Sequence, residues 1–222
     1  MPIGFGTIFV NVPLGGMGGT HGFLTLIFEH GIRNEVLPLI VFMGRLDAQM
    51  KGLDRLLDAF VEICPRVPGV RLEMAGRGSP SDVRFLQDRI ASHPNGAAIS
   101  FHADVSEADK AELLSRGWVF VAPSRFEGWC IAGVEAQACG LPVVASTADG
   151  FLDSVRDGRT GILVANHEGT IRRDLAEAVI ALLTDSPRRE AMGEAGREWA
   201  GLHTWAALAQ RNEAFLRTIL PL

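Results

Sequence analysis

The sequence predicts an α/β protein with a doubly wound, Rossmann-like parallel sheet, and three observations support this prediction. From about residue 37 onward, short apolar runs alternate with segments of helical periodicity. The runs are continuously apolar, as is typical of strands buried on both faces of a parallel sheet. The repeated order of strand and helix requires crossover connections, which are right-handed in nearly all proteins.

The first four predicted elements show this alternation. A strand is expected over 38–43, and a helix over 53–63, where apolar residues recur at helical spacing. A second strand is expected over 70–75. The helix after it should begin at Pro80, because proline suits the first helical position.

The remaining elements continue the pattern. Ser106 is the expected N-cap of a helix over 106–116, because its hydroxyl can accept a hydrogen bond from the first turn. A helix of small residues over 131–138 should end at Gly140, just before Pro142. The other expected elements are strands over 97–101, 118–122, 141–146 and 161–164 and helices near 169–184, 187–200 and 204–218.

The chain divides at about residue 36. Residues 1–36 contain many glycines and no sustained helical period, so we interpret them as an N-terminal extension, a remnant or a linker with one or two short strands. Residues 37–222 are predicted to form one Rossmann-like α/β domain. A chain of 222 residues can bury a core without disulfide or metal.

Composition excludes several classes of protein. A net charge of −5 argues against a nucleic-acid partner, which requires a basic face. Three cysteines without a CxxC pair argue against a disulfide framework and a cysteine zinc site, and fit a reducing compartment. No apolar run approaches the roughly 20 residues of a transmembrane segment, so we expect a cytoplasmic protein.

Candidate binding residues lie in the loops after the strands, where open α/β sheets bind ligands. Arg45 and Lys51 follow the first strand of the domain and precede a helix, a combination that can bind an anion. By themselves the two cations are more simply explained as solvated loop charges. Gly76 lies in a Gly-Arg-Gly turn that would let a ligand approach the backbone, although most such turns bind nothing.

Two glutamates flank the start of the helix over 131–138. Glu127 precedes this helix and Glu135 lies inside it, and helical side chains tilt toward the N-terminus, so both should border one cleft. A carboxylate among apolar residues needs a partner, since burying it unpaired is costly. That partner could be a ligand hydroxyl or a structural arginine such as Arg45, and spacing leaves both open.

Four segments taken together resemble a known family. They are, in order, GRLDAQMKGLDRLLDAF, LEMAGRGS, VFVAPSRFEGWCIAGVEAQACGLPVVAS and SVRDGRTGILV. This series is similar to the C-terminal, donor-binding domain of GT-B retaining glycosyltransferases (glycosyl transferases group 1, family 4-like). The resemblance covers about residues 37–205. Its most specific part is the pair Glu127 and Glu135 with seven residues between them.

The resemblance implies roles for individual residues. Arg45 and Lys51 would clamp a nucleotide diphosphate and stabilise the leaving group, Glu127 would contact donor-sugar hydroxyls, and Glu135 would accept hydrogen bonds from the ribose. Arg45, Lys51 and Glu127 would be the catalytic residues. The implied nucleotide-sugar site comprises Gly44, Arg45, Lys51, Gly76, Glu127, Trp129, Cys130, Ile131 and Glu135. Neither a metal nor a cofactor is implied, because the two cations take the role that a metal ion plays elsewhere.

The function implied is hexosyl transfer, with retention, from a nucleotide-diphosphate sugar to an acceptor hydroxyl. The family pattern has Phe-Gly where this chain has Trp129-Cys130, and the family has a second Rossmann-like domain that residues 1–36 cannot form. We therefore expect only the donor-binding half here. The alternative is a non-catalytic nucleotide-sugar-binding module, or one subunit of a split two-chain transferase.

A chain with only one of two domains should expose an apolar surface. We expect this surface around Phe126, Trp129 and Phe151. It would favour self-association or a partner chain.

Overall fold

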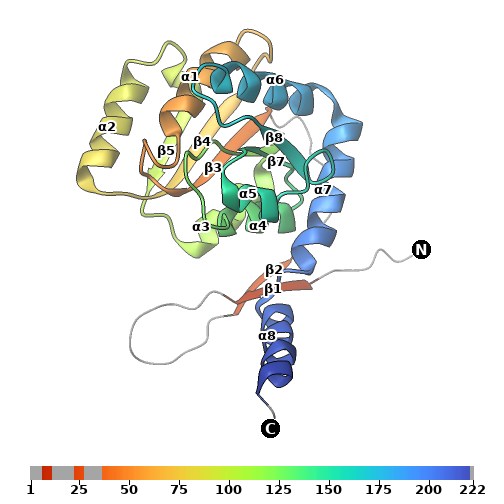
Figure 1. Ribbon diagram of the computed structural model, residues 1–222. Helices are drawn as coiled ribbons and strands as arrows, with labels where there is room; N and C mark the ends of the chain where they lie inside the picture. Colours follow the sequence, from red (N-terminus) through yellow and green to blue (C-terminus); the bar gives the residue numbers. More distant parts are fainter. Residues whose placement is uncertain (1–6, 12–22, 28–36, 221–222) are drawn as a thin grey trace.

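A computed structural model describes residues 7–11, 23–27 and 37–220 of the chain, and its centre is a six-stranded parallel sheet (Figure 1). The strands of this sheet are β3 (Leu39–Arg45), β4 (Arg71–Arg77), β5 (Ile99–Ala103), β6 (Val119–Ala122), β7 (Val143–Ser146) and β8 (Gly161–Val164). The helices are α1 (Leu53–Ile63), α2 (Pro80–Ala91), α3 (Glu107–Arg116), α4 (Ile131–Ala138), α5 (Asp149–Ser154), α6 (Ile171–Thr184), α7 (Ser186–Gly201) and α8 (Trp205–Ile219). The predicted fold class is confirmed.

Alternate side chains of the central strand β3 point into two separate cores. Ile40 and Phe42 pack into one core with residues of α1 and α6. Val41 and Met43 pack into the other, which includes residues of α3, α4 and α5. A continuous apolar run therefore serves both faces of the sheet, since successive residues of a strand alternate between faces.

The strand order places a binding crevice. The order is β5-β4-β3-β6-β7-β8, so the direction of winding reverses between β3 and β6. Ligands of open α/β sheets bind outside the carboxyl ends of the strands at such a reversal. The loops after β3 and β6 carry the candidate residues identified from the sequence.

Most predicted elements are found with shifts of one to three residues at their ends. Ser106 is the N-cap of α3 and forms a reciprocal capping box with Asp109, and α2 begins at Pro80 as expected. The strands β3 and β4 extend two residues further than predicted, to Arg45 and Arg77. The short helix α5 was not predicted.

The N-terminal region contributes a separate two-stranded antiparallel sheet. It consists of β1 (Thr7–Asn11) and β2 (Phe23–Ile27), with Thr7 opposite Ile27. The strands agree with the expectation of one or two short strands before residue 36. The glycine cluster between them lies outside the described residues.

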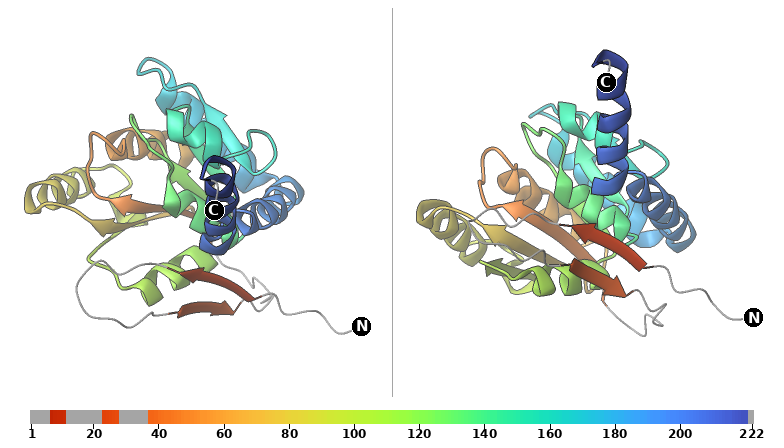
Figure 2. Two further views of the ribbon diagram at one scale, coloured as in Figure 1. Left: turned by 60° about the horizontal axis from the view of Figure 1, so that its bottom comes forward. Right: turned by 90° about the horizontal axis from the view of Figure 1, so that it is seen from below.

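The last helix differs from the others in its surroundings. α8 extends away from the sheet and its flanking helices (Figures 1 and 2), and none of its residues is buried.

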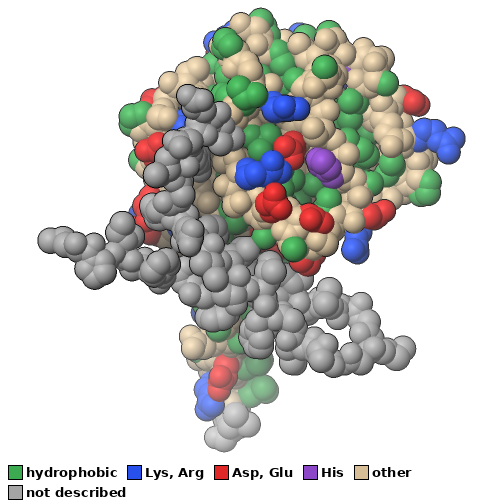
Figure 3. Space-filling model, turned by 180° about the vertical axis from the view of Figure 1, so that it is seen from behind, with side chains coloured by type: hydrophobic (Ala, Val, Ile, Leu, Met, Phe, Trp, Pro, Cys, Tyr) green, Lys and Arg blue, Asp and Glu red, His purple; other side chains and the backbone are tan. Residues whose placement is uncertain are grey.

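Within the described ranges, no helix combines the length and apolar character needed to span a bilayer. On the uncovered part of the face in Figure 3, basic and acidic side chains are interspersed.

Candidate functional site

Three adjoining hollows lie at the carboxyl ends of β3 and β6. The central hollow, of about 460 Å³, includes seven of the nine residues predicted from the sequence. These seven are Gly44, Arg45, Lys51, Glu127, Trp129, Cys130 and Ile131. The other two, Gly76 and Glu135, line a second hollow of about 540 Å³, the β4-side hollow, with Arg77, Ser79 and Lys110. All nine residues therefore gather at one edge of the sheet.

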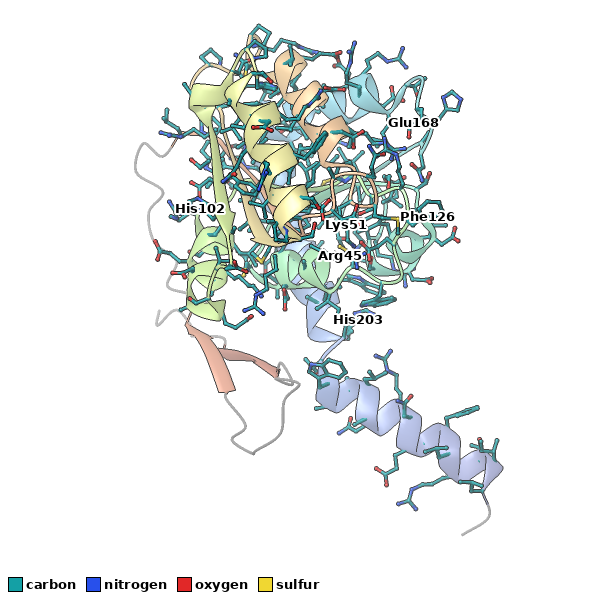
Figure 4. All side chains as sticks on the ribbon, turned by 90° about the vertical axis from the view of Figure 1, so that its left-hand side faces the viewer. Arg45, Lys51, His102, Phe126, Glu168 and His203 are labelled. Atoms are coloured by element: carbon teal, nitrogen blue, oxygen red, sulfur yellow. The ribbon has the colours of Figure 1, made fainter. Side chains whose placement is uncertain are left out.

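A third, β8-side hollow of about 500 Å³ lies beyond Lys51 and Glu127. It is lined by Arg125, Phe126, Asp149 and Asn166, among others. Arg45 lines all three hollows, and its side chain is 64% exposed. Its ion-pair partner is Asp47, at 4.0 Å, so the guanidinium can reorient toward an anion in any of them. Figure 4 shows Arg45 and Lys51 side by side, with Phe126 further out.

Lys51 and Glu127 form an ion pair inside the central hollow. The Lys51 Nζ atom donates a hydrogen bond of 2.7 Å to Glu127 Oε2, and the Glu127 side chain is only 11% exposed. The backbone N–H of Gly128 donates to the other carboxylate oxygen at 3.2 Å. The two groups expected to contact the donor are therefore bonded to each other.

Glu135 has no equivalent partner. Its carboxylate makes no hydrogen bond or ion pair within the part of the chain that the structure describes, and Arg45 pairs with Asp47 instead. Burial raises the pKa of Glu135, while the charge of Lys110 acts in the opposite direction. A half-buried carboxylate facing a hollow with an unused hydrogen-bonding capacity can accept hydrogen bonds from ligand hydroxyls.

The loop before α4 has an unusual backbone conformation. Cys130 is the N-cap of α4 with φ 59° and ψ 68°, in the left-handed region that glycine adopts most easily. The family resemblance has glycine at this position, so the conformation is kept although the residue differs. Burial raises the pKa of the Cys130 thiol to about 12, so the thiol is protonated at neutral pH and is no nucleophile.

Two glycines let the site close up. Gly52 is the N-cap of α1 at φ 66°, and a Cβ atom there would lie 2.1 Å from the Pro123 carbonyl oxygen. Gly76 of β4 lies opposite Gly44 of the neighbouring strand β3, and a Cβ atom there would lie 1.7 Å from the Gly44 carbonyl oxygen. Only glycine allows these backbone segments to approach so closely.

Trp129 lines the central hollow and also contacts an aromatic side chain near the C-terminal helices. Its ring lies 5.4 Å from that of His203, which in turn lies 4.3 Å from the ring of Trp199. These contacts join the loop before α4 to the connection between α7 and α8. They fix one wall of the site against the C-terminal helices.

The expected apolar surface is only partly found. The Phe126 side chain is 68% exposed, in agreement with the expectation. Phe151 is fully buried, so its assignment to the surface was wrong. It lies in α5, the helix that was not predicted, and that helix turns its side chain into the core shared with α4.

Several site residues were missed by sequence reasoning. Lys110 of α3 lines the β4-side hollow, and Asn166, after β8, lines the β8-side hollow. Asn166 follows the carboxyl end of a strand, so the rule that identified Arg45 could have identified it too. Among the described residues, no group of three or more His, Cys, Asp or Glu side chains could hold a metal ion.

Comparison with known proteins identifies curated relatives of the chain. It is 33% identical over 182 residues to a phosphatidyl-myo-inositol mannosyltransferase of Mycobacterium tuberculosis, covering 81% of this chain and 47% of the relative. It is 34% identical over 197 residues to a D-inositol 3-phosphate glycosyltransferase of Kribbella flavida, covering 85% and 45%. The chain spans about half the length of these relatives.

Solved structures with the same fold include transferases. Sucrose-phosphate synthase from Thermosynechococcus elongatus superposes with a TM-score of 0.73 at 28% identity, covering 82% of this chain and 45% of that one. The HepE protein of Anabaena, solved with UDP and glucose, superposes with a TM-score of 0.72 at 21% identity, covering 83% and 49%. At that identity, the second comparison shows the fold alone.

The sequence also matches a family as a whole. Residues 25–199, more than three quarters of the chain, match the family described as glycosyl transferases group 1. The match includes the loops after β3 and β6 and the whole of α4. The chain belongs to the glycosyl transferases group 1 family.

Proposed function

We propose that this chain is the donor-binding half of a retaining glycosyltransferase that uses a nucleotide-diphosphate sugar. The observation that carries the proposal is that two cations and two glutamates gather at one edge of the sheet. Of the glutamates, Glu127 is paired with Lys51, whereas the Glu135 carboxylate has no hydrogen-bond or ion-pair partner among the described residues. The family match and the relatives named as mannosyl- and glycosyltransferases support it. HepE, which shares the fold, was solved with UDP and glucose.

Each part of the donor has a counterpart in the hollows. Glu135 accepts hydrogen bonds from ribose hydroxyls in the β4-side hollow. Arg45 and Lys51 bind the diphosphate in the central hollow, where the N–H groups of Trp129, Cys130 and Ile131 at the start of α4 add partial positive charge. Glu127 accepts hydrogen bonds from sugar hydroxyls.

The chemistry follows from these placements. The bond between the anomeric carbon and the diphosphate oxygen breaks, and a bond from the acceptor hydroxyl oxygen to the same carbon forms on the same face. Negative charge develops on the departing diphosphate, which takes up the acceptor proton. Fixed cations at the point where charge develops stabilise the transition state most effectively. Arg45 and Lys51 do this without a metal or a cofactor, and the reaction is proposed to take place in the cytoplasm.

A calorimetric screen of UDP-, GDP- and ADP-sugars tests the proposal. The expected result is that at least one donor binds, that replacing Lys51 or Glu135 weakens this binding about 10-fold, and that replacing the distant Arg66 leaves it unchanged. Arg66 lies beyond the C-terminal end of α1, whose N-terminal end faces the site. Failure of all three donor classes to bind would contradict the proposed function.

A second candidate is a subunit of a split transferase, or a binding module without transfer. It is favoured by α8, whose apolar side chains Trp205, Leu208 and Phe215 are exposed. An assay for transfer distinguishes the two candidates. A binding module binds the donor and transfers nothing with any added chain, whereas a split enzyme gains activity with its complementary chain.

A further inference from the structure

The side chain of Arg125 uses all of its hydrogen-bonding capacity next to the site. Its Nε donates to Glu168 Oε1 at 2.8 Å, and its two terminal nitrogens donate to both oxygens of Asp54 at 2.8 Å. The remaining two N–H groups reach the Gln49 carbonyl oxygen at 2.8 Å and Glu168 Oε2 at 3.4 Å. A guanidinium has five N–H donors, and all five have a partner here.

The backbone of Arg125 connects the same loops. Its N–H donates to the Met50 carbonyl oxygen at 2.9 Å, and its carbonyl oxygen accepts a hydrogen bond of 3.1 Å from Asn166 Nδ2. Residue 125 therefore joins three segments that are far apart in sequence: the loop after β3, the loop after β6 and the loop after β8.

A second arginine supports this arrangement from below. Arg55, whose side chain is only 5% exposed, donates to Glu168, to Asn166 Oδ1 at 2.8 Å and to the Pro123 carbonyl oxygen at 3.1 Å. The two arginines share the carboxylate of Glu168, and Arg125 also binds that of Asp54, so two cations and two anions balance in the cluster. The two arginines also hold the pKa of Glu168 down, to about 2, so this balance persists over the usual pH range.

The cluster holds the two loops whose tips carry the ion pair of the central hollow. Lys51 follows Met50 directly, and Glu127 is two residues beyond Arg125. With both loops anchored to one guanidinium, the positions of the Lys51 ammonium and the Glu127 carboxylate are fixed relative to each other. A misplacement of about 1 Å at a reacting centre can cost roughly 100-fold in rate.

We propose that Arg125 is a positioning residue that holds Lys51 and Glu127 in register for a nucleotide diphosphate. The inference rests on the proposed function. The side chains of Asp54, Arg125 and Glu168 are 24%, 20% and 63% exposed, so this part of the cluster lies at the surface beside the site. Its bonds connect loops at the site edge, where they determine how the site is arranged.

A double-mutant cycle tests this role. Arg125→Lys keeps the charge but loses the planar fork that binds Asp54 and Glu168 together. Affinity for UDP, GDP and ADP is measured by calorimetry for the wild type, Arg125→Lys, Lys51→Ala and the double variant. If Arg125 acts through Lys51, its replacement weakens binding about 10-fold in the wild type and less than twofold in the Lys51→Ala background, because coupled residues are not additive.

Two further variants complete the experiment. Arg66→Lys alters another two-bond pair with a carboxylate, Glu177, away from the site, and should change affinity in neither background. If Arg125→Lys does not fold, Asp54→Asn takes its place in the cycle, since it removes one anchor of the same guanidinium. The expected coupling with Lys51 is the same.

The outcomes separate this inference from the function beneath it. Equal weakening in the wild type and in Lys51→Ala, or no weakening in either, would show that Arg125 does not act through Lys51, and would overturn the inference while leaving the proposed nucleotide binding intact. If none of UDP, GDP and ADP binds the folded wild type, the proposed function and the inference fall together. Unequal weakening, concentrated in the background that contains Lys51, supports the positioning role.

Discussion

The Lys51 ammonium lies 2.7 Å from the Glu127 carboxylate, although 76 residues separate them in the sequence. Both groups are also those expected to bind the donor, one through phosphate and the other through sugar hydroxyls. When a donor binds, its phosphate therefore competes with Glu127 for the Lys51 ammonium. The pair balances two partly desolvated charges inside the central hollow.

Replacing Lys51 and replacing Glu127 should have opposite effects on the affinity for nucleoside diphosphates. Lys51→Ala should weaken UDP or GDP binding about 10-fold, since a charge-assisted hydrogen bond is lost, and should flatten the salt dependence. Glu127→Gln should tighten binding of the same diphosphates, on the order of threefold, because Lys51 is released from its counter-ion. Calorimetry at two salt concentrations measures both. Weaker diphosphate binding by Glu127→Gln would contradict this account of the pair.

Glu135 should act on the ribose rather than on the diphosphate. Glu135→Ala should weaken nucleotide binding by roughly 10-fold without changing its salt dependence, as expected for lost hydrogen bonds to a carboxylate. A 2′,3′-dideoxynucleotide should bind the wild type more weakly than the normal nucleotide, whereas Glu135→Ala should hardly distinguish them. The same relative loss in both proteins would show that Glu135 does not contact these hydroxyls.

The same residue should destabilise the free protein at neutral pH. Burial raises the pKa of Glu135, so the folded state binds this proton more tightly than the unfolded state does. The folded protein therefore loses stability as the pH rises through the pKa of the folded state, because the buried carboxyl then becomes charged. Glu135→Gln should therefore unfold at a higher temperature at pH 7.5, by roughly 2–4 °C for about 1 kcal/mol. Below the unfolded pKa the difference should vanish. Scanning calorimetry at pH 7.5 and 4 measures it, and a lower Tm for Glu135→Gln at pH 7.5 would contradict it.

Cys130 should invert the usual ranking of alanine and glycine. At an ordinary position a protein with alanine is more stable than one with glycine. Cys130 has φ 59°, a conformation in which an L side chain costs about 1 kcal/mol. Cys130→Ala and Cys130→Gly both lose the buried thiol, so their difference isolates the backbone cost. Denaturant unfolding should show Cys130→Gly more stable than Cys130→Ala by about 1 kcal/mol. The opposite order would mean that the loop relaxes out of this conformation.

The sequence was sufficient for the sheet and for the edge that carries the site. Strands such as β3 are continuous apolar runs because both of their faces are buried, and Ser106 marks the start of α3 by its capping chemistry. Once the sheet was predicted, Arg45 and Glu127 had to lie near each other, because the carboxyl ends of parallel strands share one edge.

Other features depend on contacts that no local pattern reveals. The bond from Lys51 to Glu127 and the cluster around Arg125 join loops more than 70 residues apart, and each loop alone contains only ordinary charged residues. Helix α5 has six residues, a glycine at its second position and no side-chain N-cap, so the sequence contains no strong helix signal there. The burial of Phe151 followed from that missed helix.

The last prediction concerns transfer by the 222-residue chain alone. Glycosyl transfer needs donor and acceptor held together with water excluded, which can lower the barrier by several kcal/mol. Here Phe126 is exposed at the β8-side hollow, and α8 extends from the domain with apolar side chains in solvent. We therefore expect the purified chain to bind a nucleoside diphosphate and to form no glycoside with a panel of acceptor alcohols. Light scattering should show association that decreases when Phe215 of α8 is replaced by Glu, whereas Arg217→Ala on the same helix should leave it unchanged. Efficient glycoside formation by the monomer would refute the prediction and would mean that residues of this chain alone complete an acceptor site.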